Sequence, residues 1–378
     1  MKLTVHSGFG IETATKLELR RLGIDAPCDN GRFSFDGTAS DIARLNMYLR
    51  TADRVSIVAG EFTATTFDEF FDGVKSIPWA DYCGKHTKVT VNAKSVDSTL
   101  FALSALQSVG KKAIVTKLSE NYGVLDESGE ELKVEFALYK DKATVLIDTS
   151  GSGLHKRGYR DLVYEAPVKE TIAAAIIGLS VWNPGRPFAD PFCGSGTFPI
   201  EAALVAKNIP SGYFREFLFE NYSFIDKKHI EDLRKEAKDA IIQNPHVEIF
   251  GGDINDMAIE LAAHHAENAG VADIIKFRKA DARAMDFVSR RGVIACNPPY
   301  GERLLKEKEV RKLYSAFGKS FRKLPDWSLY LLTAYADFEN AFGEKADKAR
   351  KIYNATLPCR VYRYLAKAPA NKEKNNAH

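Results

Sequence analysis

Two short stretches of the chain have the residue types of a reactive site. The first, "DPFCGSGTF" (190–198), places Gly194 and Gly196 in a turn between an expected strand and an expected helix. The second, "NPPY" (297–300), follows another apolar run much later in the chain. Glycines let a chain turn sharply with its N–H groups exposed, and a helix N-terminus attracts polar ligands. The two stretches therefore predict a ligand-binding turn and a rigid polar turn that holds a second molecule.

The glycine turn lacks the common phosphate-binding signatures. The dinucleotide pattern G-x-G-x-x-G needs glycine at position 199, where Pro199 stands, and no Gly-Lys-Ser/Thr follows. Asp190, directly before the turn, would repel a phosphate and attract a cation. S-adenosylmethionine carries a sulfonium and an ammonium but no phosphate, so we expect it as the cofactor. The alternative is a glycine turn that only packs a helix against a strand.

Carboxylates are expected at the ends of three successive strands. Asp190 ends the first, Asp253 in "IFGGDIND" the second, and Asp281 in "RKADARAMD" the third. A carboxylate at a strand end can accept hydrogen bonds from ribose hydroxyls, which we expect of Asp253. Asp281 would accept from the exocyclic amine of adenine. Aspartate is also a frequent turn former, so only the set of three favours a binding site.

The "NPPY" turn has the groups needed to hold a planar –NH₂. Its prolines make a rigid, extended turn with free carbonyls. The oxygens of Asn297 and Pro298 could accept both amine hydrogens while the Tyr300 ring stacks on the base. This would free the nitrogen lone pair for methylation by alignment and charge stabilisation, without a metal or a covalent intermediate. The alternative is a turn that merely ends a strand. Cys193 and Cys296 are interpreted as packing residues, not nucleophiles.

The elements that must position these turns alternate along the chain. From residue 160 to 368, strand-like and helix-like runs predict a mainly parallel α/β sheet with helices on both faces. Two final strand-like runs, 350–357 and 359–367, predict a hairpin at one edge. Residues 207–246 are expected to be an insertion, residues 1–60 and 61–153 two mixed α+β blocks, and residues 369–378 a disordered tail.

The composition is typical of a globular protein and does not identify a ligand. The 378 residues are 45% hydrophobic and 27% charged, with a net charge of +3. Five scattered cysteines favour neither disulfides nor a zinc site. No apolar run approaches a membrane span and the first residues do not resemble a signal peptide, so we expect a cytoplasmic protein. A local basic run, "LHKRGYR" (154–160), is either an RNA contact through Lys156, Arg157 and Arg160 or an ordinary solvated linker.

Taken together, these motifs resemble class I S-adenosylmethionine-dependent RNA methyltransferases with a THUMP domain. The resemblance rests on "DPFCGSGTFPIEAA", "GGDIND", "KADARAMD" and "NPPYGERL", and on "GSGLHKRGYR" with "APVKETIAAA" at the junction. It implies a Rossmann-like class I methyltransferase domain over 160–368, preceded by a ferredoxin-like domain (1–60) and a THUMP RNA-binding domain (61–153). The chain is most similar to the guanine-N2 methyltransferases of bacterial 23S rRNA, while archaeal tRNA guanine-N2 enzymes share the architecture.

The resemblance also implies roles for individual residues. The residues assigned to the cofactor are Asp190, Phe192, Gly194, Gly196, Thr197, Asp253, Ile254, Asp281, Ala282 and Asn297. Those assigned to catalysis are Asn297, Pro298 and Tyr300, with Pro299 shaping the turn.

Two other functions fit parts of the sequence. A protein glutamine methyltransferase would use the same "NPPY" chemistry, but the N-terminal RNA-binding resemblance argues against it. A non-catalytic RNA-binding or ribosome-assembly factor would need neither an intact cofactor turn nor "NPPY". The sequence leaves open the target nucleotide, rRNA or tRNA, naked RNA or ribosomal particle, and the oligomeric state.

Overall fold

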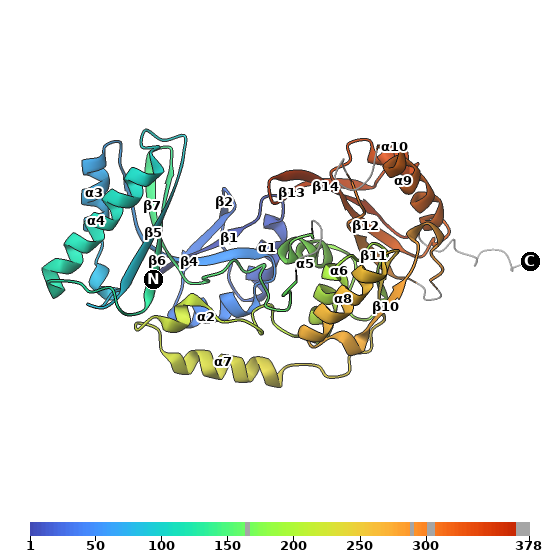
Figure 1. Ribbon diagram of the computed structural model, residues 1–378, viewed down its shortest axis with the longest axis horizontal. Coiled ribbons are helices and arrows are strands. Elements are labelled where there is room, and N and C mark those ends of the chain that lie inside the picture. Colours follow the sequence, from blue (N-terminus) through green and yellow to red (C-terminus); the bar gives the residue numbers. More distant parts are fainter. Residues whose placement is uncertain (163–166, 288–290, 301–306, 368–378) are drawn as a thin grey trace, which may run out of the picture. The chain divides into compact units, whose positions relative to one another are not determined.

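The computed structural model describes residues 1–162, 167–287, 291–300 and 307–367 (Figure 1). They form two compact units, each built on a seven-stranded sheet. The N-terminal unit consists of residues 1–7, 19–154 and 215–239. The C-terminal unit consists of residues 8–18, 155–214 and the described residues from 240 to 367. The expected tail and the last four residues of "NPPYGERL" (301–304) lie outside the described residues.

One continuous sheet runs through the N-terminal unit in the order β2-β3-β1-β4-β7-β6-β5. Its strands are β1 (Lys2–Ser7), β2 (Cys28–Asp29), β3 (Arg32–Asp36), β4 (Ala52–Thr63), β5 (Lys88–Val96), β6 (Glu131–Tyr139) and β7 (Lys142–Asp148). The long strand β4 pairs with β1 on one side and with β7 on the other. The expected blocks 1–60 and 61–153 therefore share one sheet, because β4 crosses the expected boundary.

The helices of this unit differ in how they begin. They are α2 (Ala39–Tyr48), α3 (Phe67–Lys75), α4 (Leu103–Tyr122) and α7 (Lys227–Asp239), with the short turns η1 (Trp79–Asp81) and η2 (Leu218–Asn221). Capping boxes start α2 at Thr38 and α3 at Thr66. The helix α1 (Glu12–Arg21) has residues in both units.

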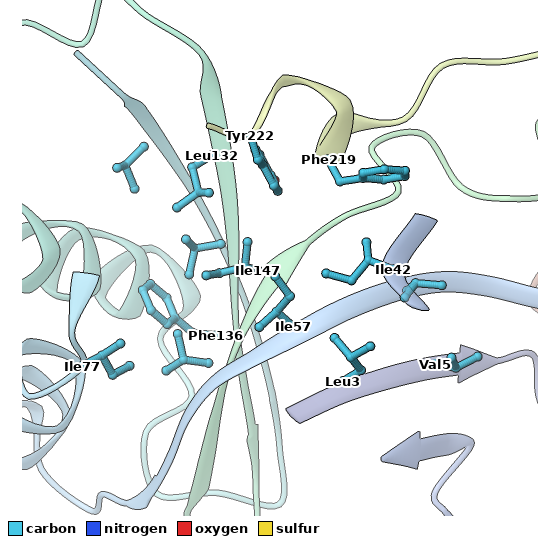
Figure 2. Packing of buried hydrophobic residues seen from close by; sticks show 14 of the residues in the cluster. Leu3, Val5, Ile42, Ile57, Ile77, Leu132, Phe136, Ile147, Phe219 and Tyr222 are labelled. Atoms are coloured by element: carbon cyan, nitrogen blue, oxygen red, sulfur yellow. The ribbon is translucent and has the colours of Figure 1, made fainter. Parts of the chain in front are cut away.

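The expected insertion contributes to the N-terminal core. Phe219 and Tyr222 are buried with the sheet residues Leu132 and Ile147 in one apolar cluster (Figure 2). The Tyr222 hydroxyl donates a hydrogen bond to the Asp148 carbonyl. Residues 215–239 thus complete a core that the sequence alone assigns to residues 1–153, and a fragment ending at 153 would leave this apolar surface uncovered.

The C-terminal unit has the strand order β10-β9-β8-β11-β12-β14-β13. Its strands are β8 (Phe188–Asp190), β9 (Ile249–Asp253), β10 (Ile275–Lys279), β11 (Val293–Cys296), β12 (Ser328–Thr333), β13 (Lys348–Asn354) and β14 (Leu357–Tyr364). The first five in this order are parallel, and β13 and β14 form an antiparallel hairpin at the edge, as predicted. The chain runs outward from β8 to β10 and returns to β11 on the other side of β8. The topological switch point therefore lies between β8 and β11.

Helices cover both faces of this sheet, as the alternation predicts. One apolar cluster includes residues of α5 (Glu170–Leu179), α6 (Thr197–Ala206) and α8 (Asp256–Asn268). A second includes residues of α9 (Glu307–Phe321) and α10 (Phe338–Phe342). The short turns η3 (Ala272–Ile274) and η4 (Ala282–Ala284) flank β10. No helix in the described part of the chain is long and apolar enough to cross a membrane.

We predict that Tyr222→Ala destabilises the N-terminal unit by about 3–5 kcal/mol, because it empties a buried aromatic site. Tyr222→Phe keeps the ring and should cost about 1 kcal/mol, the value of one hydrogen bond. Hydrogen exchange of β4 to β7, followed by mass spectrometry, measures the effect locally. Lys228→Ala, exposed on α7, is the matched control. Unchanged protection in Tyr222→Ala would show that the insertion is dispensable for this core.

Candidate active site

The two turns meet because β8 and β11 are neighbours. β8 ends at Asp190 and β11 at Cys296, and Ala189 lies opposite Ile294 in the parallel pair. Asp190 and Asn297 therefore leave the same edge of the sheet, at the switch point where open α/β sheets bind ligands. Segments far apart in the sequence are thereby brought to one site.

Gly194 and Gly196 have different structural roles in the first turn. Gly196 has φ +86°, and a Cβ there would lie 3.0 Å from the Cβ of Ala262 on α8. Gly194 has φ +50°, and a Cβ there would meet nothing within 4 Å. Gly196 thus permits close packing of α8, whereas Gly194 leaves open space over a bare backbone. This open space fits a bound ligand.

Asp190 is buried without a cationic partner. Its residue is 2% exposed, and Oδ1 accepts a hydrogen bond from the Phe192 N–H at 2.9 Å. Burial, and secondarily the negative charge of Asp253, raise the pKa of the Asp190 carboxyl well above its usual range. No basic side chain among the described residues pairs with it. A cationic ligand would favour the ionised form, so the residue fits the ammonium group of S-adenosylmethionine.

Asp253 ties the second strand end to the glycine turn. Its Oδ2 accepts from the Gly194 N–H at 3.0 Å, and its Oδ1 accepts from the Asn255 N–H at 3.0 Å. Each oxygen keeps a lone pair, so two ribose hydroxyls could still be bound. The neighbouring Ile254 is 64% exposed and offers an apolar surface beside this carboxylate.

A cavity lies beyond the ends of β8, β9 and β10. Its lining includes Asp190, Gly252, Asp281, Ala282 and Phe287. Asp281 forms an ion pair with Arg283 at 2.6 Å, and this contact lowers the pKa of the carboxyl. An ionised acceptor beside apolar walls fits an adenine ring with its amine, and the roles predicted for Asp281 and Ala282 stay predictions.

The "NPPY" turn is held from behind while its amide oxygen is left unused. The Pro299 carbonyl accepts a hydrogen bond from the Tyr314 hydroxyl at 3.2 Å, and Tyr314 also contacts the Thr333 hydroxyl at 2.9 Å. The Asn297 Oδ1 is buried and has no hydrogen-bond partner among the described residues. A buried acceptor without a donor is costly, and an amine would satisfy it.

Tyr300 is half-buried and its hydroxyl is 3.9 Å from the Cys359 Sγ. Burial raises the pKa of this phenol, so it stays protonated at neutral pH. The stacking role predicted for its ring stays a prediction.

The site cysteines do not have the properties of nucleophiles. Cys193 and Cys296 are buried, and burial raises the pKa of both thiols well above the usual range. A buried, protonated thiol is a poor nucleophile. The structure therefore agrees with their interpretation as packing residues.

The RNA-contact prediction is wrong for Arg157. This residue is 2% exposed, and its Nε is 3.2 Å from the Glu201 Oε1 on α6. The Tyr159 hydroxyl contacts the same oxygen at 3.3 Å. A guanidinium buried in this network cannot reach a phosphate. Arg157 instead anchors the helix that follows the glycine turn.

Arg160 is only partly buried, so its predicted RNA contact stays a prediction. Its side chain is 15% exposed and lies between Glu170 and Thr197. Lys156 is exposed, and its RNA contact stays a prediction.

His265 is a packing residue behind the glycine turn, and no sequence motif singles it out. This residue is fully buried, and its Nδ1 lies 3.1 Å from the Ser195 carbonyl in the glycine turn. A signal was present, because His265 continues the helical stripe of Ala258, Ala262 and Ala266 that faces the sheet. His264, one residue earlier, is partly exposed and contacts Asp161.

Comparisons with known proteins agree with this geometry. Residues 157–363 match the RMKL-like methyltransferase domain family (UPF0020), residues 2–56 the RlmL ferredoxin-like domain, and residues 64–148 the THUMP domain. The chain belongs to the RMKL-like methyltransferase family. The predicted fold class, the THUMP region and S-adenosylmethionine as cofactor are thereby confirmed.

Two relatives show how far the similarity extends. YpsC of Bacillus subtilis strain 168, named as a candidate RNA methyltransferase, is 42% identical over 99% of both chains. The ribosomal RNA large subunit methyltransferase K/L of Psychromonas ingrahamii is 31% identical over 97% of this chain. The alignment covers 50% of that longer protein.

Solved structures are similar over nearly the whole chain. SMU.472, a candidate methyltransferase in complex with S-adenosylhomocysteine (SAH), has a TM-score of 0.93 and 42% identity over 98% of this chain and 99% of its own. A Listeria monocytogenes protein described as a predicted N6-adenine-specific DNA methylase has a TM-score of 0.91 and 45% identity over 97% of this chain and 96% of its own.

We predict that Asp190→Asn weakens SAH binding about tenfold to a hundredfold, the value of a charge-assisted hydrogen bond. The same change should raise the unfolding temperature of the ligand-free protein at neutral pH. The raised pKa means that the folded state holds the Asp190 proton more tightly than the unfolded state. The contribution of Asp190 to folding stability is therefore lost as the pH rises from its unfolded-state pKa to its raised folded-state pKa. Asparagine does not ionise, so the variant does not lose stability in this way.

The wild-type affinity for SAH should increase with pH as Asp190 ionises, whereas the affinity of Asp190→Asn should stay flat. Calorimetry and thermal unfolding measure both quantities, with Asp337→Asn at the start of α10 as the control. Equal SAH affinity in wild type and Asp190→Asn would remove Asp190 from the cofactor site.

Proposed function

We propose that this protein transfers a methyl group to the exocyclic N2 amine of a guanine in RNA, with 23S rRNA as the substrate. The observation that carries the proposal is the buried, unpartnered Asn297 oxygen at the switch point, next to the cofactor turn. The name of the Psychromonas relative supports rRNA, and the name of YpsC supports RNA. The THUMP match supports an RNA-binding role for the N-terminal unit.

The chain's own residues would make the amine reactive. S-adenosylmethionine supplies an electrophilic methyl group. The Asn297 Oδ1 accepts one hydrogen of the amine, and the Pro298 carbonyl accepts the other. These two bonds draw the hydrogens out of the plane of the base, so the lone pair is released from the ring. The Tyr314 bond to Pro299 holds the turn rigid, and rigid acceptors need no reorganisation when the reaction occurs.

The same acceptors suit any planar –NH₂, so substrate tests must include rival classes. Adenine N6 in DNA, named for the Listeria relative, and a glutamine side chain in protein both present such a group. Base methylation requires the base to leave its stack, so an unpaired guanine should be preferred. Labelled methyl transfer to rRNA, tRNA, DNA and protein, each added separately, distinguishes these substrates. Label in DNA or protein but not RNA would reject the proposal.

We predict that Asn297→Ala lowers the rate of single-turnover methyl transfer by at least about a hundredfold, the scale of removing one preorganised polar group. SAH affinity should change much less, because Asp190 and Asp253 are untouched. Tyr300→Phe keeps the ring and should retain most activity, whereas Tyr300→Ala should lose most of it.

Asn340→Ala on α10 is the matched control for Asn297→Ala, since its side chain only contacts Asp337 at the surface. Full activity in Asn297→Ala would mean that "NPPY" is only a strand-ending turn. If Tyr300→Phe is as inactive as Tyr300→Ala, methyl transfer requires the Tyr300 hydroxyl and the stacking interpretation is wrong.

A further inference from the structure

The strands β13 and β14 form a hairpin at one edge of the C-terminal sheet (Figure 1). β12 ends at Thr333, which lies opposite Arg360 of β14, and the hairpin continues beyond this pair to its turn. Since β12 is parallel to β11, the turn of the hairpin lies at the same end of the sheet as the "NPPY" turn. The Tyr300 hydroxyl is 3.9 Å from the Cys359 Sγ of β14. The end of the hairpin therefore borders the candidate active site.

An exposed aromatic ring is held against this end of the hairpin. Phe9, which precedes α1, is 66% exposed, and its ring packs edge-to-face with the ring of Tyr353 on β13, with the centroids 5.4 Å apart. The chain next to Phe9 follows the β13 backbone closely, because a Cβ at Gly10 would lie 2.4 Å from the Lys351 carbonyl oxygen. Phe9 is thus fixed in position while most of its surface is accessible to a ligand.

Two basic side chains adjoin the aromatic pair. Lys351 and Arg360 lie directly opposite each other in the β13–β14 ladder, and both are exposed. The Lys351 Nζ lies over the Tyr353 ring, 5.2 Å from its centroid. Neither cation forms an ion pair with a carboxylate of the described residues. Like charges directly opposite each other destabilise a sheet, so this position suits an anion that lies near both cations.

An aromatic ring beside unpaired cations is the combination that binds single-stranded nucleic acids, because bases stack on the ring and phosphates contact the cations. We propose that this surface, formed by Phe9, Tyr353, Lys351 and Arg360, binds an unpaired stretch of the substrate RNA next to the target nucleotide. A base stacks on Phe9, and Lys351 and Arg360 bind phosphates. The inference rests on RNA as the proposed substrate class, but it does not depend on guanine as the target.

Binding of two RNA probes to the full chain, saturated with SAH so that no methyl transfer occurs, tests the stacking role. The probes are a labelled oligouridylate and the same strand paired with oligoadenylate, and fluorescence anisotropy measures both affinities. Phe9→Leu should weaken oligouridylate binding about fivefold to a hundredfold, the value of one base–aromatic stack, and should change duplex binding much less. Phe9→Tyr keeps the ring and should bind both probes like the wild type.

The salt dependence of oligouridylate binding tests the phosphate contacts. Lys351→Gln and Arg360→Gln should each reduce the slope of log affinity against log salt concentration by about 0.7, the value for one phosphate of a single strand. Neither variant should be less stable than the wild type, because each removes a like-charge pair. Lys348→Gln is the matched control, since Lys348 is an exposed lysine at the other end of β13, and it should leave the slope unchanged.

Three results would overturn the proposal: no oligouridylate binding by the wild type, unchanged binding in Phe9→Leu, or an equal loss for both probes in that variant. Loss of binding in the lysine and arginine variants alone would indicate an anionic partner that does not stack, such as an acidic protein, and would also overturn it. If RNA methylation fails while Phe9→Leu still weakens oligouridylate binding selectively, the proposed reaction is wrong and this surface stands.

Discussion

Asp190 ends β8 with its carboxylate buried, close to the charge of Asp253 and without a basic side chain beside it in the described structure. Burying a charge without a partner is costly, so the Asp190 carboxyl is either protonated or paired with a bound cation. Asp190 is buried because β8 lies between β9 and β11, and its carboxylate accepts one hydrogen bond from the Phe192 N–H. A ligand that binds only the folded state and brings the missing charge would therefore stabilise the unit.

The rest of the site follows from the same distribution of charge. Asp190, Asp253 and the free oxygen of Asn297 form a surface of acceptors along the ends of β8, β9 and β11. Such a surface suits groups that donate hydrogen bonds: an ammonium, ribose hydroxyls and an amine. Hydrogen-bond donors of the described residues also lie at the start of α6, where Arg160 contacts Thr197. A zwitterionic cofactor matches both sides, whereas a phosphate-bearing cofactor would meet carboxylates.

Much of the site was predictable because polar residues end apolar runs. Asp190, Asp253 and Asp281 each lie at or just after the end of a strand, and parallel strands bring their carboxyl ends to one edge. The burial of Arg157 was not predictable, because its partner Glu201 lies 44 residues away in sequence and a basic run looks the same whether buried or exposed. The same limit applies to Tyr222, because nothing local to residues 215–239 shows that they complete the core of the N-terminal unit.

We propose that the Asn297 turn and the Asp190 turn act together on a guanine amine of RNA. Mass spectrometry of nucleosides from purified 23S rRNA and tRNA tests it most directly. The strains compared would lack the gene or carry it as wild type or as Asn297→Ala. We expect N2-methylguanosine at one 23S site to be lost without the gene, to return with the wild type and not to return with Asn297→Ala. Unchanged N2-methylguanosine in both RNA classes, with loss of another modified nucleoside, would contradict it.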